Sequence, residues 1–311
     1  MKIFISLNRK KYSAMIDIID FHAHIYPDKI AEKASHSVGE FYSIPMNKIG
    51  SVETLLKSGG EAGVGMFVVQ SVATVSRQVQ SINDFIHAAC QEHPDRLIGF
   101  GTIHPGLENP VDEIERCVKL GLHGIKIHPD VQRFHMDDPS MYPIYEAIEG
   151  RLPILIHCGD YRYDFSHPRR LAHILDDFPK LEVIGAHFGG WSLWDLAMEY
   201  LLDRNCWLDT SSSFAFLGKV RSKEIIRAYG ADRLLFGDDF PMWDHKTEVE
   251  TLLSLDLTDD EYEKIFSGNA KRLLRMPPNP CPGRQAVESY GLRSRQPMAR
   301  LFRRPFCSGG G

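Results

Sequence analysis

Short hydrophobic runs rich in Val and Ile recur along the chain, and each is followed by a polar or Gly/Pro corner and then by a segment with helical spacing. Nearly every position in these runs is apolar, which is typical of parallel strands covered on both faces. The pattern therefore predicts eight strands, at residues 16–21, 64–70, 97–103, 123–127, 153–157, 182–187, 206–209 and 233–237.

Segments with helical periodicity lie between the predicted strands, at residues 76–93, 109–120, 168–178 and 192–203. Asn109 is suited to cap the second of these helices, and Gly121 stands just beyond its end. Alternating strands and helices form a parallel sheet with helices outside it. Eight such repeats match a single-domain α/β protein of the (β/α)₈ TIM-barrel class, which typically has about 250 residues. A doubly wound sheet is the main alternative, but no G-x-G-x-x-G motif follows the first strand.

The two ends of the chain depart from this pattern. Residues 1–14 are basic and irregular and are predicted to be an N-terminal extension, so the barrel is expected over residues 15–276. Residues 277–311 contain six Pro, five Gly and six Arg without apolar periodicity, which predicts a disordered basic tail. The segment 28–47 follows the first strand and lacks strand character, and we expect it to cover the active face of the barrel as a lid.

Charge and composition exclude several classes of partner. The formal net charge is −5, and the tail of residues 277–311 carries +5, so residues 1–276 carry −10. A body this acidic repels phosphate backbones, so we expect no nucleic-acid binding. No apolar run reaches the roughly 18 residues of a membrane span, and no signal peptide is recognisable. Six cysteines without a C-x-x-C pair suit reduced thiols, and we predict a cytoplasmic protein without membrane contact.

The clearest chemical signal is the sequence DFHAH at the end of the first predicted strand. Alternate residues of a strand share a face, so His22 and His24 are expected to project together while Phe21 and Ala23 point away. Two imidazoles on one face can ligate the same metal ion.

Three further candidates follow other predicted strands. His157 ends the fifth run, His187 ends the sixth, and Asp238 follows the eighth. The carboxyl ends of barrel strands converge on one face, where the active sites of this architecture lie. Imidazole and carboxylate ligands suit Zn²⁺, Mn²⁺, Fe²⁺ or Co²⁺ better than Mg²⁺ or Ca²⁺. On an extended chain Asp239 would point away from Asp238, which favours a loop or cap role for Asp239.

The motifs IDFHAHIYP, GIKIHP, LIHCG, GAHFGGW, LDTSS, LLFGDDFP and GNAKRLL together resemble the amidohydrolase superfamily, and within it the amidohydrolase-related branch that contains the aminocarboxymuconate semialdehyde decarboxylase type. The resemblance runs from about Met15 to Leu274. It implies one divalent metal ion, expected to be zinc, ligated by His22, His24, His157 and Asp238. It also implies that His187 lies against a metal-activated water and that the protein forms a homodimer.

Three residues are candidates for substrate contact. Lys126 ends the fourth predicted strand, and His128 follows two residues later. In two-metal members of the superfamily a lysine near this point is carboxylated and bridges the ions, and the alternatives here are a charged contact to substrate or a structural ion pair. Arg162 is suited to a two-pronged grip on a carboxylate, and Trp191 to a cavity wall. A solvated loop arginine and a packed aromatic are the alternatives for these two residues.

The expected reaction is hydrolysis of a small amide, lactone or ester. In it Asp238 takes a proton from the activated water and passes it to the leaving group, while His187 stabilises the charge that develops on the carbonyl oxygen. The main alternative is a lyase with the same metal site that removes CO₂ from an unsaturated or aromatic carboxylic acid. Two others are a metal-free enzyme that uses Lys126 as a Schiff-base nucleophile and a barrel that binds a small molecule without turnover.

Overall fold

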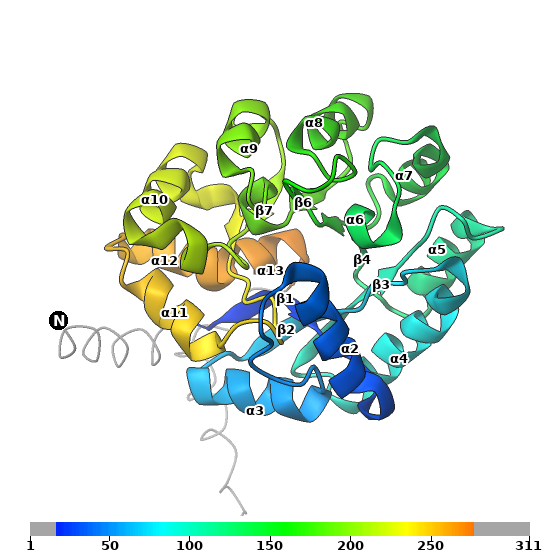
Figure 1. Ribbon diagram of the computed structural model, residues 1–311, viewed down its shortest axis with the longest axis horizontal. Coiled ribbons are helices and arrows are strands. Elements are labelled where there is room, and N and C mark those ends of the chain that lie inside the picture. The colour runs from blue at the N-terminus through cyan, green and yellow to red at the C-terminus, as the bar shows by residue number, and fades with distance from the viewer. Residues whose placement is uncertain (1–16, 277–311) are drawn as a thin grey trace, which may run out of the picture. The chain divides into compact units, whose positions relative to one another are not determined.

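The computed structural model describes residues 17–276, whose eight strands are all parallel and follow chain order around the sheet (Figure 1). Backbone hydrogen bonds from Phe21 N to Phe236 O (2.8 Å) and from His24 N to Phe240 O (2.7 Å) join the last segment to the first strand. The predicted TIM barrel is therefore confirmed, and every predicted run overlaps one strand. The strands are β1 (Ile19–His24), β2 (Met66–Gln70), β3 (Leu97–Thr102), β4 (Gly124–Ile127), β5 (Ile154–Ile156), β6 (Val183–Gly185), β7 (Trp207–Asp209) and β8 (Leu234–Leu235).

Helices surround the sheet, as Figure 1 shows. Side chains at the helix starts fix several of them: Ser51 accepts a hydrogen bond from Thr54 N before α3. Asn109 precedes α5 as predicted, but its side chain makes no capping bond. The helices are α2 (Asp28–Tyr42), α3 (Val52–Ala62), α4 (Val79–Glu92), α5 (Pro110–Lys119), α6 (Pro129–Gln132), α7 (Tyr142–Ile148), α8 (Pro168–Asp177), α9 (Trp194–Leu201), α10 (Phe214–Tyr229), α11 (His245–Leu253), α12 (Asp259–Glu263) and α13 (Asn269–Leu273).

The hydrophobic residues form two clusters, one on each side of the barrel wall. The larger cluster fills the space between the sheet and the helices. The smaller cluster fills the inside of the barrel with side chains from most of the strands, and Leu273 of α13 contributes to it. Because both faces of every strand are buried, the strands read as continuous apolar runs in the sequence. Members of the inner cluster on the strands include Ile19, Phe21, Val68, Ile98, Phe100, Leu155, Ile184 and Leu235.

A β-bulge in β1 determines which way its histidines point. The register with β2 shifts between Asp20 and Ala23. Phe21 faces the barrel interior, where its ring packs edge-on against Phe100 with centroids 5.6 Å apart. Regular alternation would place His22 on the opposite face from Phe21, but the bulge turns His22 inward as well. The expectation that Phe21 points away from the histidine face is therefore wrong.

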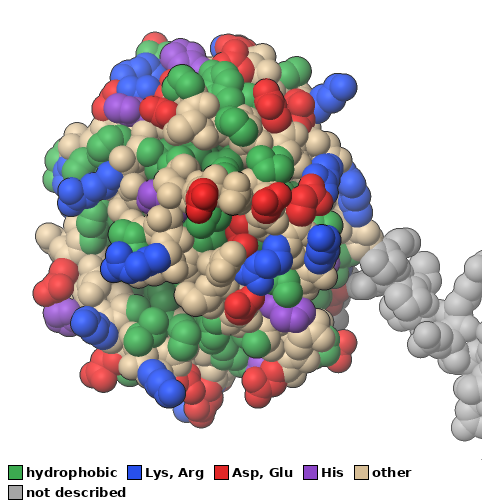
Figure 2. All heavy atoms as spheres, turned by 90° about the vertical axis from the view of Figure 1, so that its right-hand side faces the viewer, with side chains coloured by type: hydrophobic (Ala, Val, Ile, Leu, Met, Phe, Trp, Pro, Cys, Tyr) green, Lys and Arg blue, Asp and Glu red, His purple; other side chains and the backbone are tan. Residues whose placement is uncertain are grey.

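Helix α2 lies beside the carboxyl ends of β1 and β2 (Figure 1), where a lid was expected, and several of its residues line a cavity described below. Within residues 17–276, no helix is long and apolar enough to cross a membrane. On the face drawn in Figure 2, basic and acidic side chains are interspersed, without a large patch of one sign. The predicted N-terminal extension and basic tail lie outside the described residues.

Candidate active site

Three potential ligand atoms at the barrel mouth form a nearly equilateral triangle. Nε2 of His22 lies 3.2 Å from Nε2 of His24. Oδ1 of Asp239 lies 3.4 Å from the first of these atoms and 3.5 Å from the second. A point equidistant from all three is about 1.9 Å from each, which is just below the roughly 2.0–2.2 Å of bonds from zinc to nitrogen or oxygen. The triangle therefore has the size that a small divalent ion needs.

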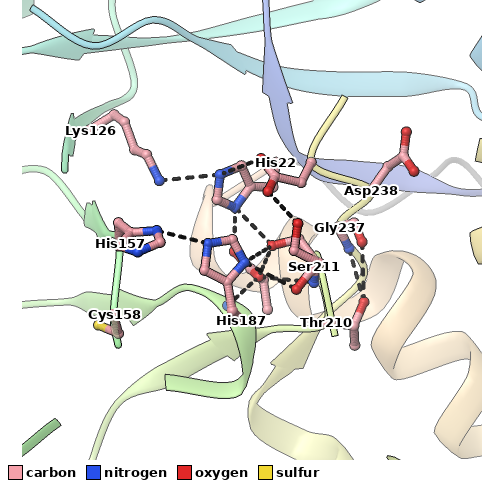
Figure 3. A network of polar contacts seen from close by, with 12 residues as sticks. His22, Lys126, His157, Cys158, His187, Thr210, Ser211, Gly237 and Asp238 are labelled. Atoms are coloured by element: carbon pink, nitrogen blue, oxygen red, sulfur yellow. Dashed lines mark hydrogen bonds and ion pairs between the residues drawn. The ribbon is translucent and has the colours of Figure 1, made fainter. Parts of the chain in front are cut away.

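In His22 and His187, the group that contacts Nδ1 determines which of the two ring nitrogens carries the proton. Nδ1 of His22 lies 2.8 Å from Oδ2 of Asp209. Because an ionised carboxylate only accepts, Nδ1 of His22 carries the proton and Nε2 has the free lone pair. Nδ1 of His187 lies 3.0 Å from the carbonyl oxygen of Ser211, so Nε2 of His187 also has a free lone pair. Figure 3 shows both rings within one network of polar contacts.

His157 is oriented by the same principle. Its Nε2–H donates to the carbonyl oxygen of Gly159 at 2.9 Å, which leaves the lone pair on Nδ1. Nδ1 of His157 lies 3.0 Å from Nε2 of His187. Two lone pairs at this distance repel each other unless a proton or a cation lies near them. The donors thus converge on one region, as expected from the ends of β5 and β6.

Burial keeps the clustered imidazoles neutral, as metal ligands must be. Burial, helped by the charge of Lys126, lowers the pKa of His22 well below 6.5, and the pKa values of His24 and His157 are lowered in the same way. Burial also lowers the pKa of His187 to about 4. The pKa of Asp239 is raised by burial to about 7. Neutral imidazoles and one carboxylate in a buried cluster are a donor set that fits a divalent transition metal.

Asp238, the carboxylate expected to bind the metal and accept a proton, lies elsewhere. Its side chain is fully buried, and Oδ2 lies 3.3 Å from Nδ1 of His245. With Asp20 and His245 it forms a cluster separate from that of His22, His187 and Asp239. Figure 3 shows Asp238 turned away from the pair of His22 and His187.

Asp239 takes the place that the sequence assigns to its neighbour. Asp238 and Asp239 do not alternate as strand residues do, because β8 ends at Leu235 and Asp239 has a left-handed backbone with φ of 67°. The backbone N–H of Asp239 donates to the carbonyl oxygen of His22 at 2.8 Å, which holds the carboxylate beside β1. This correction exchanges the expected roles of the two aspartates.

Lys126 lies at the floor of the site. Its side chain is fully buried, and Nζ lies 3.2 Å from Nε2 of His22 (Figure 3). Burial lowers the pKa of Lys126 to about 8, although the nearby carboxylates of Asp209 and Asp239 act in the opposite direction. The amine thus faces the same point as the imidazoles, as its place at the end of β4 suggests.

A cavity of about 870 Å³ opens above these groups. The polar residues that line it include His22, His24, Lys126, His157, His187 and Asp239. Most of the remaining wall is apolar or aromatic and comes from α2, α4 and the segments after β4, β5 and β8. An apolar cavity with a few convergent polar groups is typical of small-molecule sites. The wall residues include Ile30, Val38, Phe41, Tyr42, Ile82, Phe85, Val131, Phe165 and Met242.

The two other residues expected to contact substrate differ in their placement. Trp191 packs edge-on against Tyr42, with centroids 5.2 Å apart, and lines a small recess beside His187 and Asp239. Arg162 is not among the cavity residues: its guanidinium makes a two-pronged contact with Asp160, at 2.9 and 2.7 Å. With its donors already engaged, Arg162 is not free to grip a substrate carboxylate.

Several residues of the site are not singled out by the sequence. The hydroxyl of Tyr42, at the end of α2, lies 2.6 Å from Nε2 of His128. The ring of His128 stacks on that of His157 with centroids 3.7 Å apart, and His128 thereby reaches the mouth as its position two residues after Lys126 suggests. Tyr42 carries no motif, because a residue on a covering helix reaches the site only through the folded chain.

Comparison with known proteins identifies the family to which the chain belongs. A family model described as amidohydrolase (Amidohydro_2) matches residues 19–276. A 2-amino-3-carboxymuconate-6-semialdehyde decarboxylase from Dictyostelium discoideum is 40% identical over 72 residues, which are 22% of this chain and only 20% of that protein. A gamma-resorcylate decarboxylase from Polaromonas sp. is 24% identical over 268 residues, which are 67% of this chain and 80% of that protein.

Solved structures of other proteins have the same barrel fold as this chain. A dihydroxybenzoic acid decarboxylase from Polaromonas sp., with bound manganese and the inhibitor 2-nitroresorcinol, has a TM-score of 0.67 at 19% identity and covers 84% of this chain and 97% of that chain. A 5-carboxyvanillate decarboxylase from Sphingomonas paucimobilis also has a TM-score of 0.67 at 19% identity, covering 84% and 99%. At these identities the likeness shows the fold alone.

The expectation that the chain hydrolyses an amide, lactone or ester is wrong, because the relatives that it matches are decarboxylases. Both reactions use the same imidazole and carboxylate side chains, so the motifs alone do not distinguish them. Of the alternatives that the sequence leaves open, the lyase is the one that these relatives support.

Proposed function

The chain belongs to the amidohydrolase family, and on that premise we propose that it is a metal-dependent decarboxylase of an unsaturated or aromatic carboxylic acid. The relatives with the broadest coverage are named gamma-resorcylate decarboxylases, which supports this reaction. The observation that carries the proposal is the convergence of unprotonated donor atoms at the floor of a cavity with aromatic walls. Such walls fit a flat, unsaturated substrate.

One divalent ion is proposed, held by His22, His24 and Asp239, with Nδ1 of His157 as a further donor. The bound ion would attract the oxygen atoms of the substrate and draw negative charge from them. Imidazole and carboxylate donors suit Zn²⁺ as well as Mn²⁺, and manganese is present in a related solved structure. We keep zinc, the metal expected from the sequence, as the proposed ion, and manganese is the alternative that elemental analysis distinguishes.

The proposed reaction replaces the substrate's carboxylate by hydrogen. The carbon that bears the carboxylate takes a proton, its bond to the carboxyl carbon breaks, the electron pair returns to the substrate, and CO₂ leaves. His187 lines the cavity and is proposed to relay this proton: its Nε2, which has a free lone pair, takes a proton from solvent and passes it to that carbon while the backbone of Ser211 holds Nδ1. Lys126 is proposed as the cation beside the substrate's anionic group, rather than as a carboxylated bridge between two ions.

The remaining expectations about partners stay proposals. A small-molecule substrate is supported by the mainly apolar cavity with its convergent polar groups. On the face drawn in Figure 2 the charges are mixed, without a basic patch that would fit a nucleic acid. A homodimer and a cytoplasmic location are proposed from the sequence alone.

The experiment that tests the function is a panel of hydroxybenzoic and unsaturated acids labelled with ¹³C in the carboxyl group. We expect labelled CO₂ to be released from at least one of them, to stop on chelation and to resume when one equivalent of metal is restored. Products made in D₂O should carry one deuterium at the carbon that lost the carboxylate. Turnover that persists in chelator, or new acid without CO₂, contradicts the proposal.

A further inference from the structure

The cavity is larger than a single-ring acid requires. A dihydroxybenzoate has eleven non-hydrogen atoms, and at about 30 Å³ for each water-sized group it occupies roughly 330 Å³. The cavity holds about 870 Å³, so more than half of it would stay unfilled. The cavity residues beyond the polar floor are mainly apolar, and one of them, Ile30 of α2, is 50% exposed. The cavity therefore has room for a substantial apolar extension of the substrate.

Two cationic side chains lie at different depths of this cavity. Lys126 is fully buried at the floor, and Arg133, seven residues later in the chain, is exposed. Both line the cavity. Apolar residues such as Val131 and Phe165 lie along the wall as well. A ligand complementary to this cavity has an anionic group at each end and an apolar body between them.

Within residues 17–276, no hydrogen bond or ion pair engages the guanidinium of Arg133. Arg162 differs in this respect, because Asp160 occupies it. A guanidinium presents five donors in a fixed fork that matches a carboxylate. Arg133 is therefore the arginine of this cavity that is available to an anionic group of a ligand.

The backbone holds Arg133 in place at some conformational cost. Arg133 follows α6 with φ of 62° and ψ of 48°, in the left-handed region where Gly or Asn is less strained. The preceding residue, Gln132, anchors this turn: its Nε2 donates to the carbonyl oxygens of Ala73 (2.9 Å) and Ile103 (2.8 Å). An unpaired arginine at a strained, anchored position is not explained by packing within the chain.

We infer that the substrate is an elongated acid with a second anionic group, which Arg133 binds at the cavity mouth while the carboxylate to be lost lies beside Lys126. This inference rests on the proposed decarboxylase and specifies its substrate class. It makes Arg133 the residue that selects diacids over monoacids of the same length.

Two matched, unreactive ligands test the inference without turnover. Para-butylbenzoate and para-(carboxypropyl)benzoate have chains of equal length and differ in a terminal methyl or carboxylate group, and both lack ring hydroxyls. Calorimetric titration of the metal-loaded protein should show tighter binding of the diacid. Arg133→Gly should weaken diacid binding by about 10- to 100-fold, the usual effect of a lost hydrogen bond to a charged group, and change monoacid binding less than about twofold.

Arg133→Gly is a useful variant because glycine adopts this backbone without strain, so its melting temperature should not fall. Arg133→Lys should give an intermediate loss, since a single ammonium cannot make the two-pronged contact. Arg77→Ala removes an exposed positive charge from a residue that does not line the cavity and should leave both affinities unchanged. Equal effects of Arg133→Gly on the two ligands, or no effect on either, overturn the inference.

The ring-hydroxylated versions of the two ligands separate this inference from the function on which it rests. If the diacid binds through Arg133 but no CO₂ is released from any compound, the recognition stands and the decarboxylase proposal fails. If CO₂ is released from monoacids as efficiently as from diacids, with no effect of Arg133→Gly, the decarboxylase stands and the diacid inference fails.

Discussion

The carboxylate of Asp209, at the end of β7, holds the ring of His22 through a contact of 2.8 Å between Oδ2 and Nδ1. The other oxygen of Asp209 accepts the backbone N–H of His187 at 2.9 Å. One carboxylate therefore fixes the tautomer of a proposed ligand and the backbone of the proposed proton donor. Such supporting contacts are a general feature of metal sites with histidine ligands.

The variant Asp209→Asn tests this support. An amide cannot accept from Nδ1 of His22 with the strength of a carboxylate, so we expect metal affinity to fall by about 10- to 100-fold. Competition with a chromogenic chelator measures the affinity. Asp203→Asn, at an exposed position, serves as the control for loss of one negative charge. An unchanged affinity in Asp209→Asn would show that the carboxylate does not support the ligand.

Substitution of the two adjacent aspartates should change the amount of bound metal to different extents. Asp239→Asn removes a charged corner of the donor triangle, so the purified variant should hold less than about a tenth of the wild-type metal. Asp238→Asn changes a side chain that faces His245 and should keep its full complement. Elemental analysis of both variants beside the wild type gives the answer. Loss of metal in Asp238→Asn alone would restore the assignment made from the sequence.

Lys126 should destabilise the metal-free protein at neutral pH. Its pKa falls from 10.5 in the unfolded chain to about 8 in the fold because it is buried. Between these values the unfolded chain binds the proton and the folded chain does not, so stability rises with pH across this window. Below pH 8 the full cost, about 3 kcal/mol, is present.

Lys126→Met removes that cost. We expect metal-free Lys126→Met to be more stable than the wild type at pH 7, by up to about 3 kcal/mol in urea denaturation, with the difference shrinking toward pH 10. Its kcat/KM should fall, because the cation beside the substrate is lost. A variant that is less stable at pH 7 would instead support the structural ion pair for Lys126.

Glu248 in α11 should make the stability of the fold change with pH in the direction opposite to that expected for Lys126. Burial raises its pKa from 4.5 to about 8, and its Oε2 has no hydrogen-bond partner among the described residues. Between pH 4.5 and 8 the unfolded chain releases the proton that the folded chain keeps, so stability falls as pH rises. Glu248→Gln should therefore stabilise the protein by up to about 4 kcal/mol at pH 8 and by less than about 1 kcal/mol at pH 5.

Denaturation at the two pH values, with exposed Glu53→Gln as the control, checks this expectation. A stabilisation that does not grow with pH would mean that Glu248 is already ionised in the fold.

The sequence determines the barrel well because its signal is repeated eight times. Each strand is buried on both faces, and the apolar run from Arg233 to Gly237 predicts β8 although only Leu234 and Leu235 form regular strand. The same repetition places His157 and His187 at strand ends without any knowledge of the loops. Strand ends are also where parallel barrels gather their functional side chains.

The errors arise where the chain leaves regular geometry. The bulge in β1 brings Phe21 and His22 to the same side, and the left-handed backbone of Asp239 reverses the aspartates. Neither feature has a signal in strand periodicity. The sequence also favours Arg162 for substrate contact, and only the folded chain shows that Asp160 occupies this arginine.

The position of the metal is the most direct test of the central claim, which is that His22, His24 and Asp239 hold one divalent ion. Crystals of the protein purified with its metal should show, in diffraction collected at the absorption edge of that metal, one anomalous peak. The account places this peak within about 2.3 Å of Nε2 of His22, Nε2 of His24 and Oδ1 of Asp239. A peak beside Asp238 and His245, or no peak at the triangle in protein that contains metal, would contradict it.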